Sequence, residues 1–275
     1  MNTNSNTYTI IYTTVLVVVV AAILAIVSSL LKPRQIANVE LEQMKSIMLA
    51  ANIGEVDGQP DKTAKYDELF NSHITSTYVL NEKGEKSDVA TENFKESKAF
   101  KADLKSQFNA IKNGGELTLP VYEATLDNGE QVKIFPCYGA GLWGAIWGYL
   151  AVKADNKTIQ GAIFAHASET PGLGGEIASP WFYNQFDTKV LESDGQFASV
   201  KIVKGGANGN PNGVDAISGA SITSRSLQTA IAQWMDFYKA ILTASVESIP
   251  AMGLIPVEEA AEAQEAENNE SVNAQ

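Results

Sequence analysis

The sequence predicts an α+β protein in which one transmembrane helix precedes a mostly antiparallel sheet with flanking helices. Three observations support this class: an uncharged apolar run near the N-terminus, strand-like runs that begin near Leu117, and a long amphipathic pattern near the C-terminus. They divide the chain into an N-terminal tail (1–8), a transmembrane anchor (9–31), a helix-containing membrane-proximal region (32–115), a core domain (116–246) and an acidic tail (247–275).

The apolar run, "TIIYTTVLVVVVAAILAIVSSLL", contains no charged side chain. As a helix it would be about 35 Å long, enough to cross the hydrocarbon core of a bilayer. A cleaved signal peptide fits less well, because no basic residue precedes the run and because the apolar part of such peptides is usually only about 7–15 residues long. Lys32 and Arg34 follow the run and favour a cytoplasmic domain, but two charges weigh little against the translocation of a large domain.

The membrane-proximal region gives weaker signals after Pro33. Apolar spacing over residues 39–53 predicts a short amphipathic helix, and we expect a strand over 74–80 and a helix over 97–112. The segment between the first helix and Ile111 is rich in lysine and glutamate, which favours a solvated face over a docking surface.

The core domain carries clearer strand and turn signals. Two strand-like runs flank "DNG" at residues 127–129, a strong hairpin signal, and further strands fit 146–154, 158–167 and 197–205. In "SPWFYNQF", Ser179 is expected as the N-cap of a helix that begins at Pro180. A final helix over 222–244 places these apolar side chains on one face: Leu227, Ile231, Trp234, Met235, Tyr238 and Leu242.

Composition excludes several classes of function. A formal net charge of −12 argues against a nucleic-acid partner. One cysteine, Cys137, is too few for a disulfide framework or for an iron–sulfur cluster held by this chain alone, and His73 and His166 are too few for most metal sites. Redox chemistry would therefore need an organic cofactor. The tail after Pro256 is acidic without basic residues, and we expect it to be disordered.

Two glycine-rich loops are candidate ligand contacts. "GAGLWG" at 139–144 matches the dinucleotide-binding spacing, but the next segment reads as a strand, so a loop whose Leu142 and Trp143 lie beside a flat ligand fits better. Core packing of Trp143 is the alternative. "SETPGLGGE" at 168–176 can present backbone amides to a ligand, although by itself it resembles a surface turn.

A third loop, "VDAISGASITSRSL", leads into the final helix. With Ser221 as N-cap, Ile222 and Thr223 occupy the first turn, where free N–H groups and the helix dipole favour a phosphate. Gly219 and Ala220 leave the approach clear. Capping by Ser221 explains only one hydroxyl of the loop, and no lysine follows as in a Walker loop.

The nine residues "DAISGASIT" at 215–223 resemble the D-x-x-[ST]-G-A-[ST]-x-T flavinylation signal of the FMN-binding domain family. "GLWGAIWGYLAV" and "ETPGLGGEI" are similar to the other two ligand-facing segments of that family. Together with the N-terminal anchor they resemble the C subunits of Na⁺-translocating NADH:quinone reductases, over roughly residues 8–245. Ala140 departs from the pattern, which often has a basic residue there, and the acidic tail lies outside it.

The resemblance implies FMN bound covalently, by a phosphoester between its phosphate and Thr223. Esterification leaves one negative charge on the phosphate, which a helix N-terminus holds without lysine or arginine. The flavin ring is then expected against Leu142, Trp143 and the 169–174 loop. The implied site comprises Thr223, Ser221, Ile222, Ala220, Gly219, Ser218, Leu142, Trp143, Glu169, Thr170, Pro171, Gly172, Leu173 and Gly174, with Asp215 opening the signal.

By the same resemblance, the chain is an electron-transfer subunit of a Na⁺-exporting NADH:quinone reductase and relays electrons from NADH toward quinone. Its partners are the other subunits, a flavin transferase and the inner (cell) membrane, which it crosses once with the FMN domain on the periplasmic side. We expect no metal site, no catalytic acid or base, and no NADH, quinone or Na⁺ site in this chain. The alternatives are the flavoprotein G subunit of an Rnf complex, or a non-redox membrane-tethered protein that binds a small anion.

Overall fold

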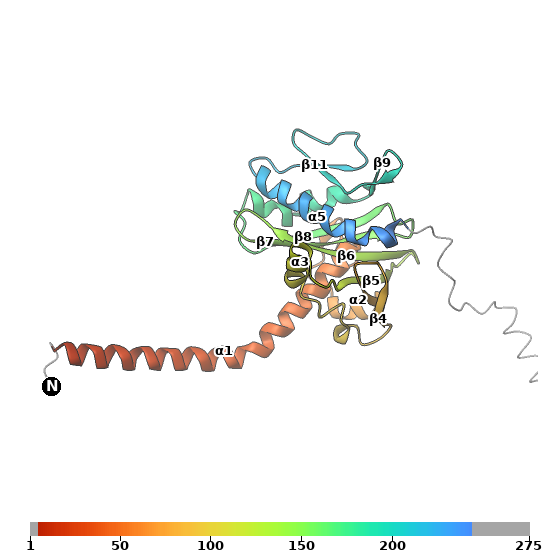
Figure 1. The fold of residues 1–275 in the computed structure, drawn as a ribbon. Coiled ribbons are helices and arrows are strands. Elements are labelled where there is room, and N and C mark those ends of the chain that lie inside the picture. The colour runs from red at the N-terminus through yellow and green to blue at the C-terminus, as the bar shows by residue number, and fades with distance from the viewer. Residues whose placement is uncertain (1–4, 244–275) are drawn as a thin grey trace, which may run out of the picture. The chain divides into compact units, whose positions relative to one another are not determined.

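A six-stranded antiparallel sheet forms the centre of the fold in the computed structural model, which describes residues 5–243 (Figure 1). Its strands are, in spatial order, β4 (Lys86–Ala90), β3 (Ile74–Leu80), β5 (Leu119–Thr125), β6 (Gln131–Ala140), β7 (Ala145–Lys153) and β8 (Ile159–His166). The predicted α+β class is confirmed, as are the strands at 74–80, 146–154 and 158–167. The membrane-proximal region contributes β3 and β4 to the same sheet as the core. The acidic tail lies outside the described residues.

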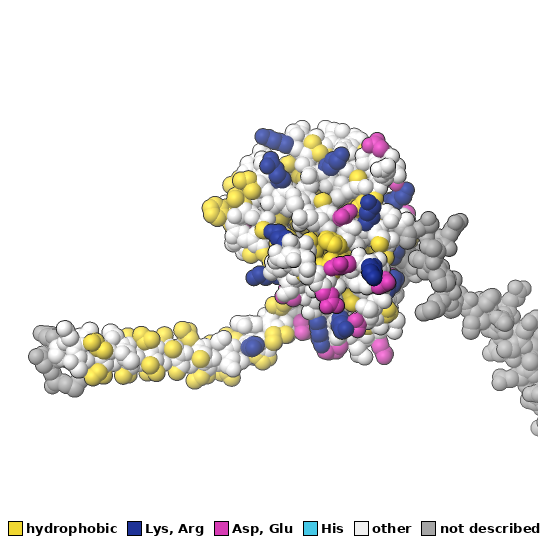
Figure 2. All heavy atoms as spheres, viewed as in Figure 1, with side chains coloured by type: hydrophobic (Ala, Val, Ile, Leu, Met, Phe, Trp, Pro, Cys, Tyr) yellow, Lys and Arg dark blue, Asp and Glu magenta, His cyan; other side chains and the backbone are white. Residues whose placement is uncertain are grey.

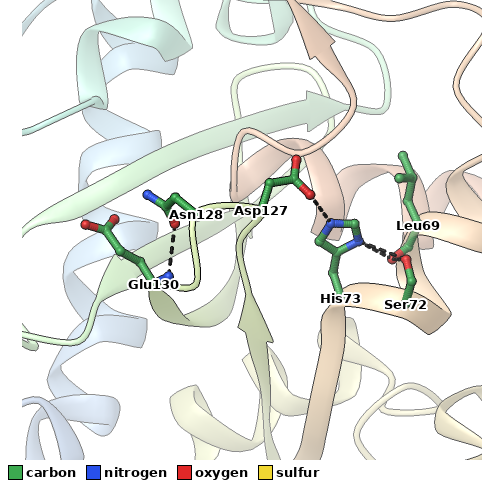
Figure 3. Close-up of polar contacts among 6 residues, drawn as sticks. All are labelled: Leu69, Ser72, His73, Asp127, Asn128 and Glu130. Atoms are coloured by element: carbon green, nitrogen blue, oxygen red, sulfur yellow. Dashed lines mark hydrogen bonds and ion pairs between the residues drawn. The ribbon is translucent and has the colours of Figure 1, made fainter.

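The turn between β5 and β6 is the predicted hairpin. The Asn128 side chain accepts a hydrogen bond from the Glu130 backbone N–H at 2.9 Å, a local bond that asparagine commonly makes in turns (Figure 3). Helix α2 (Tyr66–His73) ends beside this turn. The "DNG" signal therefore correctly predicts how the two central strands of the sheet are connected.

His73 joins the end of α2 to the hairpin turn (Figure 3). Its Nε2 lies 3.0 Å from Asp127 Oδ1, and its Nδ1 lies 2.9 Å from the Leu69 carbonyl and 3.0 Å from Ser72 Oγ. The Ser72 hydroxyl also donates to the Leu69 carbonyl at 3.1 Å, so it serves the helix end. We interpret this cluster as a structural tie rather than a hydrolytic site.

Helix α1 (Asn6–Ala50) is continuous for 45 residues and includes Pro33. The helix predicted over 39–53 is present as far as Ala50, but it is not a separate helix: the chain stays helical through Pro33 and bends along its length (Figure 1). A proline removes one helical hydrogen bond and commonly kinks a helix without ending it. Residues 6–43 are mostly exposed, whereas the last turns are buried. Among the described residues, α1 is the one helix long and apolar enough to cross a membrane (Figure 2).

The region before β5 differs from the prediction in its second helix. Helix α3 (Leu104–Asn113) replaces the helix expected over 97–112. Asp103 caps it, because its Oδ1 accepts from the Lys105 N–H at 3.0 Å and its Oδ2 from the Ser106 hydroxyl at 2.6 Å. The preceding residues form turns after a 3₁₀ turn, η1 (Phe94–Glu96), and the sheet of β1 (Glu55–Val56) and β2 (Gln59–Pro60) lies after α1.

The chain after β8 leads to the final helix through short elements. They are η2 (Gly174–Ala178), α4 (Pro180–Tyr183), η3 (Asn184–Phe186), β9 (Glu192–Ser193), β10 (Gln196–Phe197), β11 (Lys201–Val203) and β12 (Gly213–Asp215). Ser179 is the N-cap residue of α4, as predicted, but its hydroxyl donates to Glu176 Oε2 at 2.8 Å. The strand expected over 197–205 is interrupted between β10 and β11. Helix α5 (Ser221–Leu242) confirms the predicted final helix.

Both faces of the sheet are buried. One core joins α5 and α3 to side chains such as Phe135, Leu150 and Phe164. The other joins the end of α1 and α2 to side chains such as Ile134 and Tyr149. Alternate residues of β6 and β7 point to opposite faces, so these strands read as nearly continuous apolar runs. All six apolar residues predicted for one face of the final helix are buried.

Candidate cofactor-binding site

The three loops singled out in the sequence meet at one cavity. Its volume is about 310 Å³, and it is lined by Leu142, Trp143, Glu169, Thr170, Leu173, Gly174, Gly219, Ala220, Ser221, Ile222 and Thr223. Each lining residue belongs to the set implied by the resemblance. Neither lysine nor arginine occurs in this lining, so backbone groups must supply any positive potential for a ligand.

The first two loops are held together by the edge of the sheet. Residues 141–144 form the tight turn between β6 and β7, closed by the Gly141 N–H to the Gly144 carbonyl at 2.7 Å. This antiparallel hairpin rules out a dinucleotide-binding turn at "GAGLWG", which would require a helix. Ile146 pairs with His166 in β8, so the chain leaving β8 runs beside the turn. Ser168 Oγ then donates to the Trp143 carbonyl at 2.6 Å.

At the bottom of the cavity, Thr223 and Glu169 form a buried polar pair. Thr223 Oγ1 donates to Glu169 Oε2 at 2.8 Å, and the Trp143 backbone N–H donates to Glu169 Oε1 at 2.9 Å. Thr223 is 1% exposed and Glu169 is 4% exposed. Each carboxylate oxygen thus has its own donor, and the carboxylate bridges the hairpin turn to the final helix.

Two glycines make room for this pair. A Cβ at Gly174 would lie 2.3 Å from Glu169 Oε2 and 2.6 Å from Thr223 Oγ1. A Cβ at Gly141 would lie 2.4 Å from Glu169 Oε1. These separations are shorter than any ordinary contact, so a side chain at either position would displace the carboxylate. Glycine is therefore required at these two positions to leave room for the Glu169 and Thr223 side chains.

Helix α5 begins at the cavity with unpaired backbone donors. The Ala220 carbonyl accepts the first helical hydrogen bond, from the Ser224 N–H at 3.0 Å. Within the described chain, the N–H groups of Ser221, Ile222 and Thr223 donate to no other residue. These three amides and the positive end of the helix dipole form an anion-binding position beside the Thr223 hydroxyl.

The prediction that Ser221 is the N-cap is wrong, because Ser221 is already helical. The turn before the helix explains the shift. Gly219 adopts φ 76°, and the Ala220 N–H donates to the Ile217 carbonyl at 3.1 Å, which brings Ala220 to the cap position. Alanine offers no side-chain acceptor, so the first-turn amides stay available to a ligand.

The rim of the cavity is apolar and open to solvent. Trp143 is 66% exposed, Ile222 57%, Leu142 46% and Leu173 43%. Figure 2 shows hydrophobic side chains exposed at the edge of the domain where Figure 1 labels β7. Core packing of Trp143, the alternative from the sequence, is excluded by its exposure. Four large apolar side chains around one opening match a flat aromatic ligand.

Four residues of the implied set do not line the cavity. Pro171, Gly172 and Ser218 are exposed in the loops around it. Asp215 lies in β12, where its Oδ1 accepts from the Ala207 N–H at 2.6 Å and its own N–H donates to the Gln185 side chain at 2.8 Å. Asp215 therefore orders the loop before β12.

Sequence reasoning missed two supports of the site, Ser168 and His166. His166 Nδ1 accepts from the Glu169 backbone N–H at 3.1 Å, and Ser168 bonds the hairpin turn as described above. The signal that would have found them is strand register: pairing β7 with β8 places the residues after 166 beside the turn at 141–144.

Comparison with known proteins identifies first the domain family and then the subunit family of this chain. The family model described as FMN-binding domain matches residues 141–236, which contain the second and third loops and the first from Gly141 on, so the chain contains an FMN-binding domain. The chain is 32% identical over 214 residues to the C subunit of the Na⁺-translocating NADH-quinone reductase of Vibrio vulnificus, covering 74% of this chain and 81% of the relative. It therefore belongs to the family of these C subunits, as the sequence motifs indicated.

Other relatives agree with this assignment. The C subunit of the same enzyme from Pasteurella multocida is 31% identical over 225 residues, covering 75% of this chain and 80% of the relative. The crystal structure of the C subunit from Parabacteroides distasonis matches with a TM-score of 0.66 and 31% identity, over 78% of this chain and 98% of that chain. The structure of Shewanella oneidensis NqrC matches with a TM-score of 0.58 and 26% identity, over 76% and 100%.

Proposed function

We propose that this chain is the FMN-carrying electron-transfer subunit of a membrane-bound Na⁺-translocating NADH:quinone reductase. FMN is held by a phosphoester to Thr223, and electrons are relayed through it from NADH toward quinone. The observation that carries this proposal is the buried Thr223 hydroxyl beside three free helix amides, in a cavity with an apolar rim.

The residues of the cavity fit the phosphate end of FMN. A phosphodiester carries one negative charge, which matches the three unpaired amides of Ser221, Ile222 and Thr223 and the partial positive charge of a helix N-terminus. β-Branching restricts χ1 of Thr223, so a link through its oxygen has one direction of approach. A covalent link also keeps the local cofactor concentration high, which matters outside the cytoplasm, where we propose the domain lies.

The rim residues fit the ring end. Leu142, Trp143, Leu173 and Ile222 would cover an aromatic ring while the opening leaves one edge accessible to a redox partner. FMN, when bound, supplies the one- and two-electron chemistry that the side chains of this site do not offer. Residues of this chain orient the ring and hold the phosphate, and NADH, quinone and Na⁺ bind elsewhere in the complex.

The N-terminal part of α1 serves as the membrane anchor. Its apolar residues are exposed over a length that matches a bilayer. No Asp, Glu, Lys, Arg or His occurs in residues 9–31, so this span offers no ion path of its own. We infer that the other subunits provide the Na⁺ pathway, and that a flavin transferase attaches the cofactor.

Retention of flavin after denaturation tests this function. We would isolate the full-length chain from membranes, denature it and measure flavin fluorescence in a denaturing gel, for the wild type, Thr223→Val and Ser221→Ala. Valine keeps the β-branched shape without the oxygen, and Ser221→Ala removes a hydroxyl from the same helical turn. We expect fluorescence in the wild type and Ser221→Ala and none in Thr223→Val. Denaturation-resistant fluorescence in Thr223→Val, or a colourless wild type, would contradict the proposal.

A further inference from the structure

The Glu169 carboxylate contacts the one oxygen that the proposed function requires as a nucleophile. We propose that Glu169 is the general base for attachment of FMN: it accepts the proton of Thr223 Oγ1 as the phosphoester forms. This inference rests on the proposed function and adds a catalytic residue to the maturation of the protein. Electron transfer itself needs no such group.

The geometry of the pair is that of a nucleophile and its base. Glu169 Oε2 lies 2.8 Å from Thr223 Oγ1, within the range for direct proton transfer. The Trp143 N–H fixes the other oxygen at 2.9 Å. Burial of both side chains keeps water from replacing either partner. Gly141 and Gly174 leave space for the carboxylate at this position and for little else.

Glu176, a second carboxylate close to Glu169 in the sequence, has hydrogen bonds of a purely structural kind and serves as a comparison. Glu176 Oε2 accepts hydrogen bonds from the Trp181 indole and the Ser179 hydroxyl, both at 2.8 Å, and these bonds lower the pKa of Glu176. Glu176 is partly exposed and does not line the cavity. Glu169, by contrast, uses one of its oxygens to bind a hydroxyl that a ligand at the three free amides would contact.

The chemistry needs an activated FMN. Displacing water from FMN itself is unfavourable in water, so the donor class is a pyrophosphate diester of FMN, as in a flavin dinucleotide. The bond from Thr223 Oγ1 to phosphorus forms, and the bond from phosphorus to the pyrophosphate bridging oxygen breaks with its electron pair. The leaving group departs as a nucleoside monophosphate, and the hydroxyl proton passes to Glu169 Oε2. Nothing is oxidised or reduced.

The site can stabilise both the transferred phosphoryl group and the residue that takes the proton. The amides of Ser221, Ile222 and Thr223 can stabilise the charge on the transferred phosphoryl group, in the manner of an oxyanion hole. Glu169 is neutral at the moment it holds the transferred proton, so two buried negative charges do not face each other while the phosphoester bond forms.

The test measures the rate of attachment rather than electron transfer. Full-length chain purified without flavin would be mixed with a flavin transferase and flavin adenine dinucleotide, and the mass of the chain followed with time. We expect Glu169→Gln, which keeps the shape but places an N–H donor where one carboxylate oxygen accepted, to gain FMN about 10²–10⁴-fold more slowly than the wild type. Glu176→Gln is the matched control and should react at the wild-type rate. Glu169→Asp, a shorter carboxylate, should be intermediate.

A folding check accompanies each variant, by denaturant unfolding. A folded Glu169→Gln that gains FMN at the wild-type rate would overturn the inference. If that variant does not fold, Glu169→Asp decides, because a folded Glu169→Asp that gains FMN at the wild-type rate would overturn the inference equally. These outcomes differ from failure of the proposed function, in which the wild-type chain itself gains no FMN at Thr223.

Discussion

Aromatic side chains fill both the core between the sheet and α5 and the core between the sheet and α1 and α2. The two cores differ in what lies beside them. Under α5, Trp234 Nε1 donates to the Tyr138 carbonyl at 2.8 Å, and the helix begins at the candidate cofactor cavity. Under α1, the buried turns around Ile47 continue into an exposed apolar helix. One face therefore positions a ligand site, and the other mounts the domain on its anchor.

The largest expected effects come from truncating one aromatic on each face. Trp234→Ala and Phe70→Ala each remove a fully buried side chain, and each should lower the free energy of unfolding by about 3–5 kcal/mol. At denaturant concentrations where it is still folded, Phe70→Ala should bind flavin. Trp234→Ala should not, because α5 loses the Trp234 contact that packs it against β6. Urea unfolding and flavin fluorescence measure the two quantities. Equal flavin loss in both variants would mean that the two faces do not differ in function.

A pair of glycine substitutions separates the two faces further. Gly174→Ala pushes against Glu169 and Thr223, whereas Gly161→Ala places a Cβ 2.5 Å from Asn52 Oδ1 and 2.7 Å from the Ala50 carbonyl, at the end of α1. Each should cost about 1–3 kcal/mol. We expect at least tenfold slower flavin attachment in Gly174→Ala only, and faster hydrogen exchange around residues 50–53 in Gly161→Ala only. The reverse pattern would show that the two faces are not separable.

A pH-dependent effect of about 1 kcal/mol or less is expected near the end of α1. Burial raises the pKa of Asp187 to about 6, against a hydrogen bond from Asn52 that lowers it, and burial with the charge of Asp187 raises the pKa of Glu55. A raised carboxyl pKa means that the folded state binds the proton more tightly than the unfolded state. The stability from that proton is present below about pH 4 and is lost as pH rises through about 6.

Asp187→Asn removes the part of this dependence that comes from Asp187. The variant should match the wild type below about pH 4 and be more stable near neutral pH, by an amount reduced by solvent screening. Urea titrations at acidic and neutral pH measure the difference. A variant that is less stable than the wild type at neutral pH would refute the assignment, and unchanged flavin attachment is the expected control.

The smallest effect is expected at the tie between α2 and the hairpin turn. Asp127 is exposed, so Asp127→Asn, which weakens its contact with His73, should change the free energy of unfolding by about 0.5 kcal/mol or less. Thermal unfolding measures it. A change above about 2 kcal/mol would mean that this surface pair stabilises the fold far more than exposed pairs do.

The sequence predicted the α5 face better than the α1 face. Local signals, such as "DNG" and the apolar spacing from Leu227 to Leu242, depend on neighbouring residues and were confirmed. The start of α3 at Leu104 depends on the hydrogen bonds of the Asp103 cap, and α1 continues through Pro33 although proline lacks an N–H; apolar periodicity reports neither feature. The prediction of Ser221 as N-cap failed because the preceding turn, and not the hydroxyl, fixes where α5 begins.

For the candidate site, motifs identified the three loops but not how they meet. All eleven residues that line the cavity were in the predicted set. The Thr223–Glu169 hydrogen bond joins residues 54 positions apart and depends on the register of β7 and β8, which composition and motifs do not encode. The role of Asp215 in ordering a loop was likewise out of reach.

The mass of the peptide that contains residue 223 is the most direct test of covalent FMN attachment. The full-length protein, produced together with a flavin transferase and isolated from membranes, would be digested and analysed by mass spectrometry. We expect a peptide heavier by one FMN less one water, with the added mass on Thr223. An unmodified Thr223 in protein that still carries flavin would contradict the covalent link.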